Sequence, residues 1–336
     1  VHMMNVEKTS LIPSWQQEMQ SAFTKIDDLL QFLALDLDDL SLHYKAAKDF
    51  PLLVTKSYAD RIVKSDWHDP LLLQVLPTPN ELKRHPDFLN DPVGDGQALV
   101  LPGLLHKYHG RVLLITTAAC AIHCRYCFRR HYPYSDSPSG LEQWRQSLEA
   151  IAQDTNIEEV ILSGGDPLVM SDQSIGQLLS ALADISHVKH VRFHTRTPVI
   201  IASRMTSTLL SHLKSTRLKV WFVIHSNHAN ELDGEVLTSL AKLQQIGIPV
   251  LNQAVLLRRV NDSEDALYGL CKRLIDAQIT PYYLHQLDEV AGAAHFYVSP
   301  DRGRELIAAI RKRLPGYAVP RYVKEIAGEQ SKTVLA

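Results

Sequence analysis

The chain has 336 residues, of which 45% are hydrophobic and 21% are charged, and its formal net charge is −2. This length suits one large core, alone or with a smaller appendage. The charge gives no reason to expect nucleic-acid or membrane-surface binding, and no apolar run approaches the roughly 18–20 residues of a membrane-spanning helix. No secretory signal is visible, so we expect a cytoplasmic protein, and residues 1–3 are typical of an expression-tag remnant.

The first part of the chain predicts short helices. Up to about residue 75 the apolar residues have helical spacing, and Pro13 stands at a helix start. Prolines and glycines between residues 77 and 103 predict a loop-rich connection that wraps the core. We therefore expect an N-terminal helical and loop-rich region over residues 1–100.

Six short apolar, β-branched runs follow, separated by helical stretches. The predicted strands are 112–117, 160–163, 191–195, 220–225, 250–255 and 282–285. The predicted helices are 141–153, 175–185, 203–213, 235–245 and 264–277. Intervals of roughly thirty residues match βα units. They predict an α/β fold, a partial (β/α)6-type TIM barrel over residues 101–310, with a short tail over 311–336.

Chemically distinctive residues stand where these strands end. They are Gly164, Gly165, Asp166, Arg196, His225, Gln253 and Asp288. In a βα barrel, the carboxyl ends of the strands meet at one mouth, where catalytic residues gather. We therefore expect these residues to share one site.

Three cysteines, Cys120, Cys124 and Cys127, follow the first strand with Cys-x3-Cys-x2-Cys spacing. Thiolates bind iron and zinc alike, so a 4Fe–4S cluster, a zinc site and plain structural thiols all stay open at this point. Three ligands on a cubane would leave one iron free for a small molecule. The fourth cysteine, Cys271, has the helical spacing of a buried apolar residue.

Basic residues surround the cysteine motif. They are His123, Arg125, Arg129, Arg130 and His131. Cations offset the negative charge of a thiolate-bound cluster, so their presence favours the cluster over zinc.

The motif, with Tyr126 and Phe128 beside the third cysteine, resembles the signature of the radical S-adenosylmethionine superfamily. Residues 163–167 resemble its glycine-rich motif. More closely, several blocks resemble the lysine 2,3-aminomutase family, and the branch that makes β-lysine for elongation factor P. These blocks are 120–130, 163–168, 196–199, 227–231, 252–261 and 282–296.

The resemblance implies three cofactors and a role for each matched residue. Cys120, Cys124 and Cys127 would ligate a 4Fe–4S cluster. Gly164, Gly165, Asp166, His225 and Gln253 would line the S-adenosylmethionine site. Lys332 matches the lysine that carries pyridoxal phosphate, with Lys107, Tyr108 and Arg111 around that cofactor. Arg129 would bind the substrate carboxylate, and Asp288 and Glu325 its ε-ammonium.

The chain departs from the family pattern at three places near this predicted site. Glu325 stands where the family has an aspartate, and His285 where many members have tyrosine. Of the glycines that usually precede the cofactor lysine, only Gly328 remains. These departures change the reach of the acidic side chain at position 325 and the backbone freedom of the tail before Lys332.

The implied reaction converts (S)-α-lysine into (R)-β-lysine, an isomerisation that moves the amino group from C2 to C3. A flavodoxin- or ferredoxin-type protein would supply the electron. Elongation factor P and its β-lysine ligase would be the functional partners, and the chain would be a monomer or dimer. The alternatives are an aminomutase for another cationic amino acid such as arginine, a catabolic free-lysine aminomutase, and a non-catalytic zinc-binding module.

Overall fold

The computed structural model describes residues 14–134 and 140–336. The expected tag remnant at residues 1–3 and the predicted helix start at Pro13 lie outside the described residues. Among the residues described, no helix is long and apolar enough to cross a membrane.

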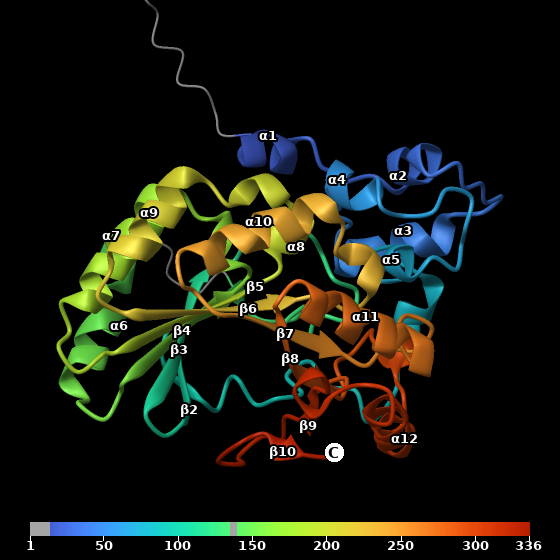
Figure 1. The fold of residues 1–336 in the computed structure, drawn as a ribbon. Coiled ribbons are helices and arrows are strands. Elements are labelled where there is room, and N and C mark those ends of the chain that lie inside the picture. Colours follow the sequence, from blue (N-terminus) through green and yellow to red (C-terminus); the bar gives the residue numbers. More distant parts are fainter. Residues whose placement is uncertain (1–13, 135–139) are drawn as a thin grey trace, which may run out of the picture.

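One ten-stranded sheet organises the molecule, and its strands follow chain order from β1 to β10 (Figure 1). The strands are β1 (Leu99–Leu101), β2 (Leu104–Tyr108), β3 (Arg111–Thr117), β4 (Glu159–Gly164), β5 (His190–Thr195), β6 (Lys219–His225), β7 (Val250–Val255), β8 (Thr280–His285), β9 (Arg321–Lys324) and β10 (Thr333–Val334). Neighbours from β3 to β9 pair in parallel, whereas β1–β2, β2–β3 and β9–β10 are antiparallel.

The six predicted strands are confirmed as β3 to β8, and the partial barrel is confirmed with them. Four strands come as additions: β1, β2, β9 and β10. β9 extends the parallel sheet and β10 pairs with it, both within the segment expected to be a tail, whereas β1 lies in the stretch expected to be loop. All four are five residues or shorter and show little period in the sequence.

Helices connect successive parallel strands and cover one face of the sheet (Figure 1). They are α6 (Leu141–Gln153), α7 (Asp172–Ala183), α8 (Thr197–Ile200), α9 (Ser207–Ser215), α10 (Gly234–Gln245), α11 (Glu264–Asp276) and α12 (Pro300–Arg311). The five predicted helices correspond to α6, α7, α9, α10 and α11. Side-chain caps fix the starts of four of these five helices: Ser171, Thr206, Asp233 and Ser263 each accept a backbone N–H of the first turn, whereas α6 follows Gly140 and has no side-chain cap.

Successive side chains of a strand point to opposite faces of the sheet, and this alternation separates the hydrophobic core from the polar site. On β5, Val191 and Phe193 are fully buried in the layer between sheet and helices. His190, Arg192 and His194 are only partly buried and lie on the opposite, inner face. The helix-facing side is therefore the hydrophobic core, and the inner face carries the polar chemistry.

The N-terminal region is a second, smaller packing unit. Its helices are α1 (Ser14–Gln20), α2 (Ile26–Phe32), α3 (Ser41–Asp49), α4 (Lys56–Ala59) and α5 (Pro70–Leu73). Their apolar side chains form one buried cluster with Ala121 and Ile122 of the cysteine segment and with Ile200 and Ile201 after α8. The region thus covers the segment that carries the cysteines, at the upper right of Figure 1.

Candidate active site

The three cysteines lie on one loop that begins directly after β3. Burial raises the pKa of the Cys127 thiol to about 11, and the neighbouring Cys124 adds to the rise. Burial also raises the pKa of Cys120, with contributions from Cys127 and Cys124. The structure therefore brings the three sulfurs within electrostatic reach of one another, as the spacing predicted.

The glycine-rich turn after β4 packs on this loop. A Cβ on Gly165 would overlap the carbonyl oxygen of Ala119 and lie 2.7 Å from the carbonyl carbon of Ala118. Gly164 has φ +116°, and its Cβ would lie 2.9 Å from the Thr117 carbonyl oxygen. The backbone N–H of Gly165 donates to that same oxygen at 2.8 Å. Glycine is thus required here for close contact with the residues that precede Cys120.

Asp166 is held by the protein itself. Its carboxylate accepts the backbone N–H groups of Leu168, Arg196 and Thr197 and the hydroxyl of Thr195, at 2.6–3.0 Å. Burial raises the pKa of this carboxyl, whereas these hydrogen bonds oppose the rise. Asp166 therefore joins the end of β4 to the end of β5, next to the cysteine loop.

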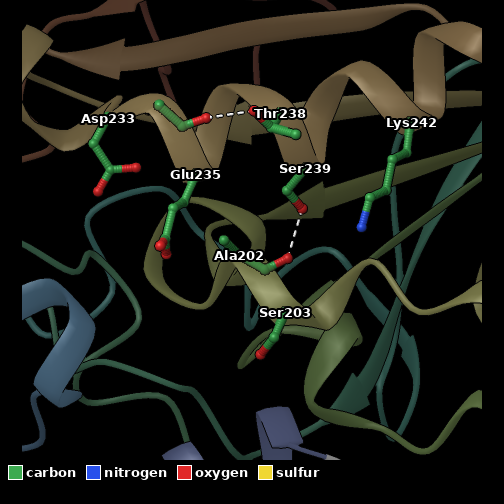
Figure 2. A pocket seen from close by; sticks show the side chains of 8 residues that line it. Ala202, Ser203, Asp233, Glu235, Thr238, Ser239 and Lys242 are labelled. Carbon is green, nitrogen blue, oxygen red and sulfur yellow. Dashed lines mark hydrogen bonds between the residues drawn. The ribbon is translucent and has the colours of Figure 1, made fainter.

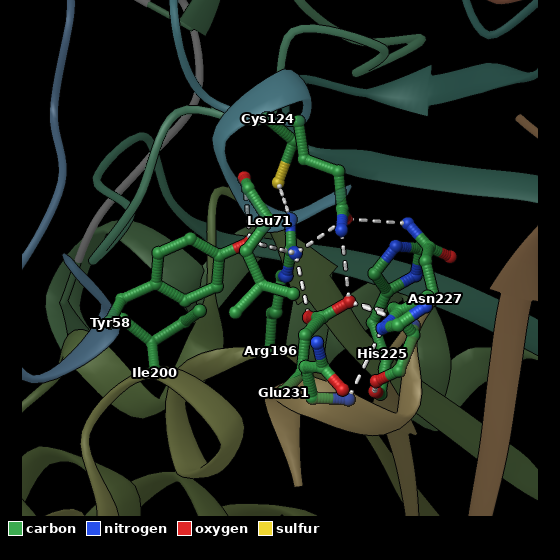
Figure 3. A network of polar contacts seen from close by, with 12 residues as sticks. Tyr58, Leu71, Cys124, Arg196, Ile200, His225, Asn227 and Glu231 are labelled. Carbon is green, nitrogen blue, oxygen red and sulfur yellow. Dashed lines mark hydrogen bonds and ion pairs between the residues drawn. The ribbon is translucent and has the colours of Figure 1, made fainter. Parts of the chain in front are cut away.

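Arg196 is the centre of a buried polar network beside the loop (Figure 3). Its Nη1 donates to Cys124 Sγ and to the Tyr126 hydroxyl, both at 2.7 Å. Its Nη2 donates to Glu231 at 2.8 Å and to Gln74 at 2.9 Å. The network thus places a guanidinium directly on the sulfur of Cys124 and balances it with a buried carboxylate.

His225, at the end of β6, faces the same loop. Its Nε2 lies 2.8 Å from the Tyr126 hydroxyl, and the two rings stack with centroids 5.6 Å apart. Gln253 lies opposite His225 in the β6–β7 register. Burial, followed by the charge of Arg196, lowers the pKa of His225 to about 3, so its imidazole is neutral at physiological pH.

The cations next to the cysteines act differently from the expectation. Arg125 forms a bidentate pair with Glu81 at 2.6 and 2.9 Å, and Arg130 donates to the same carboxylate at 2.8 Å. Both guanidiniums are therefore bound to an acid of the N-terminal region. Arg130 still acts on the cysteines, because its charge lowers the pKa of Cys127, but Arg196 makes the direct contact with Cys124.

Arg129 belongs to a second buried ion-pair chain. Its Nε donates to Asp95 at 2.7 Å, and its Nη1 donates to the Ser163 hydroxyl at 3.2 Å. The other Asp95 oxygen lies 2.7 Å from Lys107 Nζ. Burial raises and the two cations lower the pKa of Asp95, and the cations prevail. Asp95 thereby connects the cysteine loop to β2.

The C-terminal hairpin brings Lys332 into this chain. Thr333 on β10 lies opposite Lys324 on β9, so the hairpin geometry sets Lys332 beside Glu325. Lys332 Nζ is ion-paired with the Glu325 carboxylate, whose other oxygen accepts the Tyr108 hydroxyl at 2.6 Å. Because Tyr108 lies on β2, this contact bridges the two edges of the open sheet.

The remaining predicted residues lie around Lys332. The Arg111 guanidinium stacks over the Tyr108 ring, 4.8 Å from its centroid. Burial raises the pKa of Asp288 to about 7, while Lys332 opposes and Glu325 reinforces the rise. Burial and the charge of Lys332 lower the pKa of His285 well below its usual value. All three groups thus lie near the contact between Tyr108 and Glu325, where the two edges of the open sheet meet.

Sequence reasoning missed four residues of the site. They are Asp95, His194, Glu231 and Gln74. Asp95 stands between Gly94 and Gly96 in a stretch that reads as loop, and nothing in that pattern indicates a buried ion pair. His194 has one available signal, since it is two positions before Arg196 on a predicted strand.

A surface hollow of about 790 Å³ lies elsewhere, between α10 and the 3-10 helix η4 (Ala202–Arg204) (Figure 2). Its polar side chains serve the fold. Ser239 donates to the Ala202 carbonyl at 2.6 Å, Thr238 to the Gly234 carbonyl at 2.7 Å, and Asp233 caps α10. The chemistry therefore lies on the inner face of the sheet and not in this hollow.

The comparisons with known proteins agree with this arrangement. The model of the Radical SAM superfamily matches residues 114–271, from β3 through the cysteine loop into α11. The L-lysine 2,3-aminomutase of Escherichia coli (strain K12) is 43% identical over 96% of this chain and 94% of its own. Those of Buchnera aphidicola and Haemophilus influenzae are 42% and 39% identical, over 96% of this chain and 95% and 96% of theirs.

A cluster loop at the mouth of a partial barrel defines a radical S-adenosylmethionine enzyme. Within that class, the chain belongs to the lysine 2,3-aminomutase family, and it is an isomerase. This family uses a 4Fe–4S cluster, S-adenosylmethionine and pyridoxal phosphate. The alternative of a non-catalytic zinc-binding module is therefore wrong.

The residues present fit these cofactors. Three thiols on one loop, with Arg196 at 2.7 Å from Cys124 Sγ, suit a thiolate-bound cluster. Lys332 offers a primary amine at the seam, and Lys107 and Arg111 are cations that suit a phosphate. The family thus resolves the choice among cluster, zinc and structural thiols in favour of the cluster.

Proposed function

We propose that this protein is a lysine 2,3-aminomutase that converts (S)-α-lysine into (R)-β-lysine. One observation carries the proposal. The hairpin of β9 and β10 sets Lys332 on an ion-pair chain that runs through Glu325, Lys107 and Asp95 to Arg129, two residues after Cys127. An amine suited to an aldehyde cofactor and a loop suited to a radical source thereby face one site.

Each end of a bound lysine has a matching group in this arrangement. Arg129 would bind the α-carboxylate, because a guanidinium binds carboxylates in a planar, bidentate geometry. Asp288 and Glu325 would bind the ε-ammonium, and their negative charge disfavours an acidic substrate such as glutamate. The neutral Asp95–Arg129 and Glu325–Lys332 pairs hold these groups in place until a ligand competes for them.

The cofactors supply the radical and the electron sink, and the chain supplies position and exclusion of water. Cys120, Cys124 and Cys127 would hold the cluster, with Gly164, Gly165, Asp166, His225 and Gln253 around S-adenosylmethionine. Lys332 would hold pyridoxal phosphate, with Lys107, Tyr108 and Arg111 around it. Apolar packing of Tyr126, Leu257, Leu287 and Phe296 beside the loop restricts water there.

The decisive experiment incubates the reconstituted, reduced protein with lysine, S-adenosylmethionine and pyridoxal phosphate under anaerobic conditions. Chromatography should detect β-lysine with lysine as substrate, and little or no β-product with arginine. The Lys332→Ala variant should keep its iron and sulfide content and lose the isomerisation. If the unsubstituted protein forms no β-lysine, the proposal is wrong. If it converts arginine faster than lysine, arginine is its substrate instead.

We further propose that the β-lysine serves the cytoplasmic modification of elongation factor P through a β-lysine ligase. The resemblance to that branch supports this role, and a flavodoxin- or ferredoxin-type protein would supply the electron. A strain lacking this protein should yield elongation factor P without the mass of the β-lysyl group, and added β-lysine should restore it. Unchanged mass in that strain would favour a catabolic role.

A further inference from the structure

His194 has a buried ring nitrogen that the protein does not satisfy. Among the described residues, its Nε2 has no hydrogen-bond partner, although the atom is inaccessible to solvent. Leaving a buried polar atom unpaired destabilises a protein, so such an atom calls for an explanation. A ligand that is absent from the free protein is one such explanation.

The position of His194 places it at the site described above. It follows Phe193 on β5, and therefore lies on the inner face with Arg192. In the register it stands opposite Val223 of β6, two residues before His225. Its sequence neighbour Thr195 is bonded to Asp166, so the strand end is fixed next to the cysteine loop.

The charges that act on His194 are all basic. After burial, the groups that lower the pKa of its imidazole are Arg192, Lys332, Arg129 and His285. Three nearby acids are already paired, Glu159 with Arg192 at 2.6 Å, Asp95 with Arg129, and Glu325 with Lys332, and burial raises the pKa of a fourth, Asp288. A neutral imidazole among cations suits an incoming anion, because it can donate one hydrogen bond without adding charge.

We propose that His194 is a ligand-binding residue whose Nε2–H donates a hydrogen bond to an anionic oxygen attracted by Lys332 and Arg129. This inference rests on the proposed function for the identity of the ligand. The oxygen belongs either to pyridoxal phosphate or to the α-carboxylate of the amino acid. Both present the same chemistry to His194, and binding measurements separate them.

The test measures binding without turnover, in the cluster-loaded protein and without S-adenosylmethionine. One arm follows pyridoxal phosphate by equilibrium dialysis, and the other follows radiolabelled lysine on the cofactor-saturated protein. His194→Leu, which keeps bulk but no donor, should weaken one of the two affinities by about tenfold or more. The affected arm identifies which oxygen His194 contacts.

Three further variants keep the test sharp. His194→Gln places an N–H near the position of Nε2 and should bind within about threefold of the unsubstituted protein. The asparagine side chain in His194→Asn is polar but too short to reach the position of Nε2, so this variant should bind as weakly as His194→Leu. It replaces His194→Leu in the test if the leucine variant does not fold. His190→Leu, on the same face of the same strand, should change neither affinity.

The outcomes separate this inference from the proposed function. If His194→Leu and His194→Asn bind both ligands within about twofold of the unsubstituted protein, His194 is not a ligand donor. If the unsubstituted protein binds pyridoxal phosphate but forms no β-lysine, the proposed function fails, and the binding arms still decide the role of His194. If it binds neither ligand, both proposals are wrong.

Discussion

The surroundings of individual side chains set the charge states of the ionisable groups in this site. Asp288 and Glu325 are both acids near Lys332, yet burial raises the pKa of Asp288 to about 7, whereas the pKa of Glu325 is lowered. Burial acts on Glu325 in the opposite direction, but its ion pair with Lys332 and the Tyr108 hydrogen bond outweigh it. Direct pairing therefore separates the charge states of two neighbouring carboxyls.

This difference predicts how lysine binding depends on pH. Below about pH 7 Asp288 binds a proton in the free protein and loses the charge that would attract an ammonium. The dissociation constant for lysine should therefore rise as the pH falls through 7, and lysine binding near pH 7 should release protons. Radiolabelled-lysine binding across pH 6–8 checks this.

The matched control for that pH dependence is Asp288→Asn. It should bind lysine more weakly at pH 8, and its dissociation constant should no longer change between pH 6 and 8. An identical pH profile in the variant would assign the titration to another group.

At the scale of elements, close backbone contact fixes the cluster loop against β4. The contact of Gly165 with Ala118 and Ala119 leaves no space for a side chain. We expect Gly165→Ala to displace the cysteine loop and to lower iron and sulfide incorporation several-fold, because the new Cβ meets backbone atoms that cannot rotate away. Iron and sulfide analysis after anaerobic reconstitution measures the effect.

Gly269→Ala is the control, since a Cβ built there would meet no atom of the described residues within 4 Å beyond its chain neighbours and the nearby backbone of its own helix, and alanine favours the helix α11 by up to about 1 kcal/mol. It should load a normal cluster. Equal cluster content in Gly165→Ala would show that the loop tolerates a shift at this point.

The hairpin of β9 and β10 positions Lys332, so weakening it should selectively affect the amine proposed to hold the cofactor. The Leu335 N–H donates to the Tyr322 carbonyl at 2.8 Å, and the Leu335 side chain packs against the main core. Leu335→Pro removes this hydrogen bond. We expect pyridoxal phosphate binding to weaken by about tenfold or more while cluster content stays normal.

Val334→Thr is the control for the hairpin, because Val334 is 63% exposed and its replacement changes little buried surface. It should bind the cofactor like the unsubstituted protein. Loss of the cluster in Leu335→Pro would instead indicate that the hairpin supports the whole fold.

At the scale of the whole molecule, one carboxylate joins the N-terminal region to the cysteine loop. Glu81 pairs with Arg125 and Arg130, and all three side chains are buried. Glu81→Gln leaves two buried guanidiniums without an anion, and removing one partner of a buried pair costs about 3–5 kcal/mol. We expect a marked fall in thermal stability and faster loss of the cluster in air.

Glu305→Gln is the comparison on the surface. Glu305 pairs with Arg302 at 3.0 Å, and both side chains are largely exposed, so this substitution should cost less than about 1 kcal/mol. Calorimetry and cluster absorbance measure both variants. Equal stability of the two would show that Glu81 is not a structural anchor.

The predicted and observed features divide along physical lines. The six strands, five helices and three cysteines are local signals: apolar period, caps and ligand spacing each act within a few residues. The resemblance of the sequence to the lysine 2,3-aminomutase family added the prediction of radical chemistry and pointed to Lys332. The pairing of Glu81 with two arginines, of Asp95 with Arg129 and Lys107, and of Glu231 with Arg196 joins residues far apart in the chain.

By itself, the sequence determined the barrel and the cysteine loop, because the apolar period and the cysteine spacing can be recognised without knowledge of tertiary contacts. Its resemblance to known proteins pointed to the family. Only the tertiary structure decided which charges meet. It assigned Arg196 to Cys124, paired Lys332 with Glu325 across a hairpin, and left the His194 Nε2 without a hydrogen-bond partner in the part of the chain that the structure describes. The physical reason is that the charge state and role of a buried group depend on its neighbours in space, and a linear pattern does not specify them.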